Sequence, residues 1–339
     1  MRNPLLDPDL RRQLGNPEQL VTVDRMVRAD GPAVGSGVLV VRNPSGISLE
    51  VLLDRAMDIG WADAPGFPLA WRSPRGHVDP ARQEPAGDGW VQTFAGGLLT
   101  TCGLRSTGMA STVDGVHHGL HGRIGSVPAQ NVRHGFVETH DGEQAIEVTG
   151  EVVEASLGAP TLVLTRRILV LISRPEVRVE DAVTNEGYSV AGHMFRHHFN
   201  LGYPAVQSGA VVDSTAAPFG LRDDGVLPSL PWRLSGESGR SEAALGETVV
   251  YCRPDAESVT TRVTAPDGRW TEICNPSGPW PLLILWRDPR PGVNVLGVEP
   301  STSKDGGRAQ AEADGEVLWL EPGQSVSYAS NVTAGLPEA

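Results

Sequence analysis

Short extended segments, separated at close intervals by glycine and proline, dominate this chain. Its 339 residues include 40 Gly and 27 Pro, spread over the whole length, and runs rich in β-branched residues lie between them. This texture is typical of an all-β protein. The runs that predict strands span residues 37–42, 48–53, 145–153, 161–171, 177–185, 248–251, 259–265 and 281–286.

Many of these runs alternate between apolar and polar residues. In the segment 177–183, Val177, Val179 and Val183 are apolar, and Asp181 interrupts the pattern. Because successive side chains of a strand point to opposite faces, the alternation predicts antiparallel sheets with one buried and one wet face.

Helical signals are sparse. Residues 7–15 (DPDLRRQLG) combine a capping aspartate, a proline in the first turn and a terminal glycine, which predicts one short N-terminal helix. Residues 72–89 and 223–247 are rich in Gly, Pro, Ser and charge, and we expect long surface loops there. Strand texture continues on both sides of these loops and no repeat is found. We therefore expect an N-terminal extension over residues 1–30 and a single β-sandwich domain over 31–335.

Composition narrows the class of partner. A formal net charge of -13 argues against nucleic acid and anionic membranes. The three cysteines, Cys102, Cys252 and Cys274, are too few for a disulfide framework. The first 20 residues lack the apolar stretch of a secretory signal, and no run approaches the roughly 20 apolar residues that span a bilayer. We expect a cytoplasmic protein that binds a small molecule.

Six of the nine histidines fall in two short segments, HHGLHGRIG (117–125) and GHMFRHHFNLGYP (192–204). Histidine titrates close to neutral pH, so this clustering beside arginine and asparagine predicts a polar site that handles protons. On a strand, Arg196, His198 and Asn200 would share one face, where a cation, an imidazole and an amide suit the hydroxyls of a sugar. The alternative is that these residues are hydrogen-bonded groups on an exposed face.

The first histidine segment has two interpretations. His117 and His121 are four residues apart, which on a helix would place both on one face, as in zinc hydrolases. The dense glycines disfavour a helix, and no HExxH motif, cysteine or carboxylate occurs at ligand spacing. We therefore expect no metal, and instead a strand-to-turn segment that directs His121 and Arg123 into a cavity. His118 is a further candidate for substrate contact.

The segment PGVNVLGVEP (291–300) predicts an apolar strand that ends in an isolated carboxylate, Glu299. Partial burial would raise the pKa of this group and make its ionised form a stronger base, whereas a strand-end glutamate in water would be ordinary. Trp280 and Trp286 would share one strand face, and either could stack on a sugar ring or pack in the core. Arg55 could bind substrate or form a structural ion pair.

Seven segments, in their order along the chain, resemble the aldose 1-epimerase (galactose mutarotase-like) superfamily, especially its DUF4432-type branch. They lie between residues 40 and 330 and read LLDRAMDIGW, PLAWRSPRG, FAGGLLTTCGL, GLHGRIGSVPAQNV, HHFNLGYP, VLGVEPSTS and LEPGQSVSY. The resemblance implies a β-supersandwich of antiparallel sheets with a shallow sugar-binding cleft and no cofactor. In that family a glutamate takes the proton of the anomeric hydroxyl while a histidine protonates the ring oxygen. The ring then opens, C1 rotates, and the ring recloses.

Carried onto this chain, the resemblance implies Glu299, His198 and His121 as catalytic residues. The candidate substrate-binding residues are Arg55, Arg123, Arg196, Asn200, His118, Trp280 and Trp286. The family pattern N-H-x-Y-F-N-L has its histidine four residues before the asparagine, where this chain has Arg196, whereas His198 stands two before Asn200. The sequence leaves open which of the two takes the acid position. The arginine near the family's glycine-rich first motif has no counterpart before Gly96, so Arg55 or Arg123 could substitute.

Three functions fit these observations. The first is an aldose 1-epimerase or a related sugar epimerase. The second is a lyase, hydratase or isomerase that uses the same acid/base pair on an oxidised keto sugar. Such an enzyme would give a product of different mass or with a new enone absorption, whereas mutarotation changes neither mass nor absorption. The third is a non-catalytic carbohydrate-binding protein, since a fold does not fix a function. The several arginines would permit an anionic group on the sugar. A monomer and a homodimer are both open.

Overall fold

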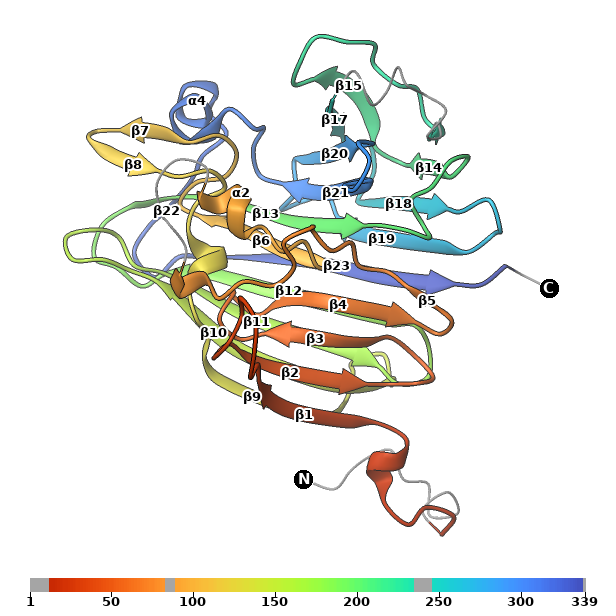
Figure 1. Cartoon of the computed structure of the whole chain (residues 1–339). Helices are drawn as coiled ribbons and strands as arrows, with labels where there is room; N and C mark the ends of the chain where they lie inside the picture. Colours follow the sequence, from red (N-terminus) through yellow and green to blue (C-terminus); the bar gives the residue numbers. More distant parts are fainter. Residues whose placement is uncertain (1–11, 83–88, 235–245, 338–339) are drawn as a thin grey trace.

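Two antiparallel β-sheets packed face to face form the body of the molecule (Figure 1). The computed structural model describes residues 12–82, 89–234 and 246–337. Within these residues, twelve strands form the first sheet and nine form the second. The predicted all-β sandwich of antiparallel sheets is confirmed.

The first sheet has the order β1-β2-β3-β4-β6-β13-β21-β20-β17-β15, with β5 paired to β4 and β22 paired to β13. Its strands are β1 (Thr22–Val27), β2 (Gly37–Arg42), β3 (Ser48–Leu52), β4 (Asp58–Ala64), β5 (Phe67–Pro68), β6 (Leu99–Leu104), β13 (Ala191–Leu201), β15 (Ala217–Leu221), β17 (Thr248–Arg253), β20 (Leu282–Asp288), β21 (Val295–Ser301) and β22 (Leu318–Leu320).

The second sheet has the order β16-β14-β18-β19-β23-β12-β11-β10-β9. Its strands are β9 (Gln130–Glu138), β10 (Gln144–Glu154), β11 (Leu162–Leu171), β12 (Glu176–Asn185), β14 (Val211–Ser214), β16 (Trp232–Arg233), β18 (Ser258–Thr264), β19 (Trp270–Pro276) and β23 (Ser325–Gly335). Each of the eight segments predicted as strands is a strand here, with ends that differ by a few residues at most.

The hydrophobic core lies between the sheets and follows the two-residue period of the strands. On β13, Phe199 and Leu201 point inward and are fully buried in this core. Leu283 and Leu285 of β20 and Val298 of β21 do the same. The alternate residues of these three strands therefore face away from the second sheet, and the candidate site is built on that outer face.

One polar network interrupts the apolar interior, and it explains the aspartate that breaks the pattern of β12. Asp181 accepts hydrogen bonds from Arg166 Nε at 2.9 Å and Nη2 at 2.6 Å. His197 Nε2 lies 2.7 Å from the same carboxylate. All three side chains are fully buried, so the arginine and the aspartate satisfy each other where water is absent.

The remaining segments of the described chain are a hairpin, two short helices and three turns outside the two sheets. A hairpin of β7 (Ser111–Val113) and β8 (Val116–His118) contacts the helix α4 (Gly307–Asp314), and the short helix α2 (Gly89–Thr93) stands over the first sheet (Figure 1). The described residues also contain the 3₁₀ turns η1 (Pro17–Gln19), η2 (Pro80–Arg82) and η3 (Ile124–Ser126). None of the helices in the described part of the chain has the length and apolarity needed to cross a bilayer.

Some predictions for the termini and loops are only partly addressed. The helix predicted over residues 7–15 lies mostly outside the described residues, and its described part is a turn and bend. The predicted loop 72–89 contains η2, and the loop 223–247 contains β16, where residues are described. β1 lies within the predicted extension 1–30 and pairs along its length with β2. The single domain over 31–335 stays a prediction.

Candidate active site

A cavity of about 600 Å³ opens on the outer face of the first sheet. Its floor consists of outward-facing side chains of β13, β21, β20 and β17. Its walls come from residues 71–75, from α2 and the residue after it, and from the loops on either side of the β7–β8 hairpin. Segments from distant parts of the sequence therefore enclose one concave site.

β13 supplies the two residues that the sequence assigned to one strand face. Arg196 and His198 both line the cavity and are 1% and 4% exposed. His197, between them, points into the interior toward Asp181. The predicted division of this strand into a polar and an inward face is confirmed.

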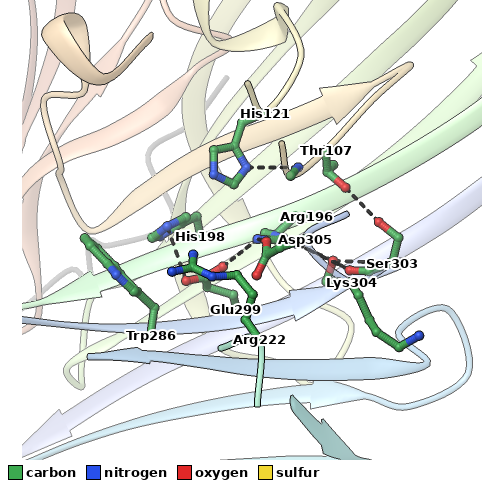
Figure 2. Close-up of polar contacts among 12 residues, drawn as sticks. Thr107, His121, Arg196, His198, Arg222, Trp286, Glu299, Ser303, Lys304 and Asp305 are labelled. Atoms are coloured by element: carbon green, nitrogen blue, oxygen red, sulfur yellow. Dashed lines mark hydrogen bonds and ion pairs between the residues drawn. The ribbon is translucent and has the colours of Figure 1, made fainter. Parts of the chain in front are cut away.

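Glu299 lies on β21, next to β13, and is 2% exposed. Its Oε2 accepts a hydrogen bond from Arg196 Nη1 at 2.9 Å, and its Oε1 lies 3.2 Å from His198 Nε2 (Figure 2). The prediction of an isolated carboxylate at a strand end is wrong, because β21 continues through Pro300 to Ser301 and the carboxylate is paired. Its predicted burial is confirmed.

His121 reaches the same cavity from the turn after β8. Its backbone has a left-handed conformation, with φ of 55°, and its Nδ1 accepts a hydrogen bond from the Gly108 amide at 3.3 Å. In the neutral ring the proton is then on Nε2, which can donate to a ligand. The ring centre of His121 is 6.0 Å from that of His198. The three predicted catalytic residues thus line one cavity.

Asp305, in the loop after β21, completes the polar centre and was missed by the sequence analysis. Arg196 Nη1 donates to Asp305 Oδ1 at 2.7 Å as well as to Glu299, and Arg196 Nε donates to the Ser301 hydroxyl (Figure 2). One guanidinium nitrogen is therefore shared by two carboxylates. The only sequence signal is that Asp305 follows the VLGVEPSTS segment closely.

Burial and these charges separate the pKa values of the two carboxyl groups. Burial raises the pKa of Glu299 to about 8, because removal of water outweighs the stabilising charge of Arg196 and the nearby Asp305 also disfavours ionisation. Burial also opposes ionisation of Asp305, but there the charge of Arg196, its hydrogen bond to Asp305 and further lowering by His121 and Arg222 together outweigh burial, so the pKa is lowered. One arginine charge therefore stabilises mainly one of the two anions.

Both cavity histidines are neutral near pH 7. Burial lowers the pKa of His121 to about 3, and Arg196 adds to this effect. Burial also lowers the pKa of His198 well below its ordinary value, with further lowering by His121 and Arg196. The expectation of a histidine near its normal pKa is therefore wrong. Arg196 cannot serve as the acid, because its two carboxylate partners raise its pKa further.

The sequence matches, over residues 33–334, the family model described as a domain of unknown function, DUF4432. The chain belongs to the DUF4432 family. Comparison of the sequence with functionally curated proteins gave no match.

Solved structures with a similar fold have epimerase or mutarotase names. A "putative aldose 1-epimerase" of Klebsiella pneumoniae subsp. pneumoniae MGH 78578 has a TM-score of 0.80 and 21% identity, over 94% of this chain and 84% of that chain. A "putative mutarotase" of Salmonella typhimurium has a TM-score of 0.63 and 11% identity, over 98% of this chain and 97% of that chain. A galactose mutarotase-like protein of Clostridium acetobutylicum has a TM-score of 0.60 and 11% identity, over 94% of this chain and 99% of that chain. These likenesses establish a mutarotase-like sandwich and confirm the predicted family resemblance.

Aromatic side chains form much of the cavity wall in this DUF4432 protein. Trp286, a predicted binding residue, stands 5.4 Å from His198 between ring centres. Trp71, Trp90 and Phe94 were missed; the Trp90 and Phe94 rings stack at 4.5 Å, and Trp71 lies 5.6 Å from Phe94. Trp90 and Phe94 are four residues apart around α2, a spacing that could have indicated one shared face.

Two predicted substrate-binding residues have structural contacts instead. Trp280 precedes β20, is fully buried, and packs against Phe195, His197 and Tyr328 in the interior. Arg55 is 6% exposed and does not line the cavity. Its guanidinium donates to the carbonyl oxygens of residues 78, 93 and 125, so it holds together a loop, the end of α2 and the turn η3.

Three further candidates lie outside the cavity lining. Arg123 is exposed, so the prediction that it enters the cavity is wrong. His118 is half-buried on β8, where burial and then Arg105 lower its pKa to about 4. Asn200 is fully buried and donates to the carbonyl oxygens of Gly97 and His198. It therefore supports the backbone beneath His198. Among the described residues, no group of three or more potential metal ligands lies together.

Proposed function

We propose that this protein is a cofactor-independent aldose 1-epimerase, or a closely related sugar epimerase, that opens and recloses a sugar ring by acid/base catalysis. The observation that carries the proposal is the contact of Glu299 Oε1 with His198 Nε2 at 3.2 Å, in a cavity that His121 also lines. Ring opening needs one group that accepts a proton from the anomeric hydroxyl and another that gives a proton to the ring oxygen. The family's structural relatives support the same reaction class.

The pKa values indicate how many protons the pair carries. Near neutral pH, Glu299 is protonated and His198 is neutral, so the two groups together hold one proton. Transfer of this proton to His198 produces the carboxylate base and the imidazolium acid that the proposed reaction requires. The opposite assignment, with Glu299 as acid and His198 as base, uses the same single proton. In either assignment, the pair becomes inactive when that proton is lost.

The surroundings suit a sugar. Trp71, Trp90, Phe94 and Trp286 offer apolar ring faces, while Glu299, His121 and His198 offer convergent polar atoms. A sugar ring has both kinds of surface, since its C–H groups and hydroxyls project from different sides. His121 can hold a substrate oxygen through Nε2–H without itself changing charge.

The direct test is the rate of anomer interconversion, measured by NMR exchange or by optical rotation of freshly dissolved sugars. We expect catalysis of at least one aldose, and an approximately 100-fold slower rate for Glu299→Gln, because a positioned acid or base typically contributes about 10²–10⁴-fold. Glu138→Gln, at an exposed position of β9, is the matched control.

Three results would redirect the proposal. Rates equal to the uncatalysed rate for a broad panel of aldoses would reject it. A changed product mass or an enone absorption would identify elimination, hydration or isomerisation of a keto sugar. Calorimetric sugar binding without turnover, unaffected by Glu299→Gln, would identify a carbohydrate-binding protein.

A further inference from the structure

A second cavity, of about 540 Å³, adjoins the first. The two share four lining residues, Met109, Arg222, Glu247 and Asp305, so side chains of these residues divide them. Arg222 is paired with Glu247, whose carboxylate also accepts a hydrogen bond from Trp286 Nε1 at 2.9 Å. Across from this pair, the Met109 amide donates to the Asp305 carbonyl at 2.8 Å. The second cavity thus begins at the polar centre of the first.

The first cavity alone exceeds the volume of one sugar ring. At a share of about 30 Å³ per water, 600 Å³ corresponds to roughly 20 non-hydrogen atoms, against about 12 in a hexose. A hexose with its anomeric carbon at Glu299 and its ring extending toward Arg222 would direct its C4 hydroxyl, across the ring from the anomeric carbon, toward the second cavity. The second cavity nearly doubles the available space.

Most residues that line the second cavity are charged or polar, beside Met109 and Ala311. The Tyr251 hydroxyl accepts a hydrogen bond from the Asp305 amide at 3.4 Å. Lys304 points away from His198, beyond Asp305 (Figure 2), and its Nζ lies 2.8 Å from Glu316. The Gln310 amide of α4 donates to Asp314 at 2.8 Å. Hydroxyl, amide and carboxylate groups in this arrangement can exchange their partners for the hydroxyls of a ligand.

Charge selects the kind of ligand. The acidic lining residues of the second cavity outnumber the basic ones. The two cations are Arg222 and Lys304, and the five carboxylates are Asp223, Glu247, Asp305, Asp314 and Glu316. An anionic group entering this cavity meets net repulsion, whereas neutral hydroxyls or an ammonium group do not.

We infer that the second cavity is a binding subsite for a second sugar unit, so that the substrate is a reducing disaccharide or a longer glycan. The reducing ring occupies the first cavity, and the attached unit, which is neutral or carries an amino group, passes between Met109 and Glu247 into the second. This inference rests on the proposed epimerase function, and it adds the length and the charge of the substrate.

The test compares anomer exchange of glucose with that of cellobiose, its diamino analogue and its uronic-acid analogue. We expect kcat/KM for cellobiose to exceed that for glucose by about tenfold or more, the effect of one or two added hydrogen bonds. Gln310→Trp fills the second cavity from an exposed position that the first cavity does not touch. It should remove the cellobiose advantage and leave glucose unchanged. Ala313→Trp, exposed on the same helix but outside both linings, should change neither rate.

A second variant tests the charge argument. Asp314→Arg reverses one charge of the second cavity, so kcat/KM should fall for the diamino analogue and rise for the uronic analogue, each by about tenfold. Ala313→Arg is its control.

Equal rates for glucose and cellobiose, or equal losses for both in Gln310→Trp, would overturn the subsite while the epimerase function stands. If no sugar is turned over, the epimerase function fails separately, and calorimetry decides the subsite. The wild type and Ala313→Trp must then bind cellobiose more tightly than glucose, and Gln310→Trp must bind the two sugars equally. Any other pattern refutes the subsite.

Discussion

Asp305→Asn removes the carboxylate that competes with Glu299 for one nitrogen of Arg196. The variant keeps the size of the side chain and an oxygen that can accept the 2.7 Å hydrogen bond from Nη1. It removes one negative charge beside Glu299, and it leaves the charge of Arg196 to stabilise a single anion. Both changes favour ionisation of Glu299, so its pKa should fall.

The size of the shift follows from the geometry. The two carboxylate oxygens accept from the same nitrogen at 2.9 and 2.7 Å, which places them about 5 Å apart. At that separation and an effective dielectric constant of about 20, a unit charge contributes about 3 kcal/mol, or about two pKa units. Relaxation and water entry reduce this value. We therefore expect the pKa of Glu299 to fall from about 8 by about one to two units.

The assay is the pH profile of anomer exchange. Because the Glu299–His198 pair needs its one proton, the wild-type rate should fall as pH rises through about 8, and in Asp305→Asn the fall should begin one to two pH units lower. Infrared titration of the protonated carboxyl band gives the same pKa without turnover. Asp213→Asn, at an exposed carboxylate of β14 that lines neither cavity, is the matched control and should leave both readouts unchanged. If the rate of Asp305→Asn falls at the same pH as the wild-type rate, or at a higher pH, the reasoning is refuted.

Three other outcomes can be tested. Glu299→Gln should raise the melting temperature above that of the wild type at pH 9 but not at pH 5. Because the pKa of Glu299 is raised, the folded state holds a proton that the unfolded state has released, and the stabilisation from this proton is lost as pH rises toward 8. Glutamine has no such proton to release, so the variant keeps its stability at pH 9. Calorimetry at the two pH values checks this. His198→Ala should slow anomer exchange by about 100-fold or more without loss of the folded state, as judged by circular dichroism. Trp280→Ala should destabilise the protein by about 3–5 kcal/mol in chemical denaturation while the kcat of the folded fraction is retained, because the ring fills the core and not the cavity.

Local alternation was sufficient to predict most of the fold and the face of β13 that lines the cavity. The period of two fixes which residues share a face, so the positions of Arg196 and His198 on one side and His197 on the other follow from the sequence. The same rule marked Asp181 as an exception in β12, and its interior pairing with Arg166 and His197 explains the exception.

The walls of the site and the pKa values were not accessible in this way. Asp305, Trp71 and Phe94 lie outside the helices and strands, where no period fixes the direction of a side chain, and Trp90 lies on α2, which has only five residues. Trp280 was misassigned for a related reason, since it precedes the first residue of β20 and the alternation does not extend to it. Arg55 donates to backbone carbonyls of a loop, of α2 and of η3, which are distant from it in sequence. The lowered pKa values of the histidines depend on the removal of water around their rings, to which the loops around the cavity contribute.

β13 carries buried polar side chains with specific partners on both faces, and these contacts specify its register. On the outer face, Arg196 pairs with Glu299 and Asp305; on the inner face, His197 contacts the Asp181–Arg166 pair. A slip by one residue would turn Arg196 toward the apolar core and leave Glu299 buried without its cation. Each of these losses leaves a buried charge without a partner, at a cost of several kcal/mol. The inner network therefore supports the proposed site from the interior, because it helps to hold His198 in the register that faces Glu299.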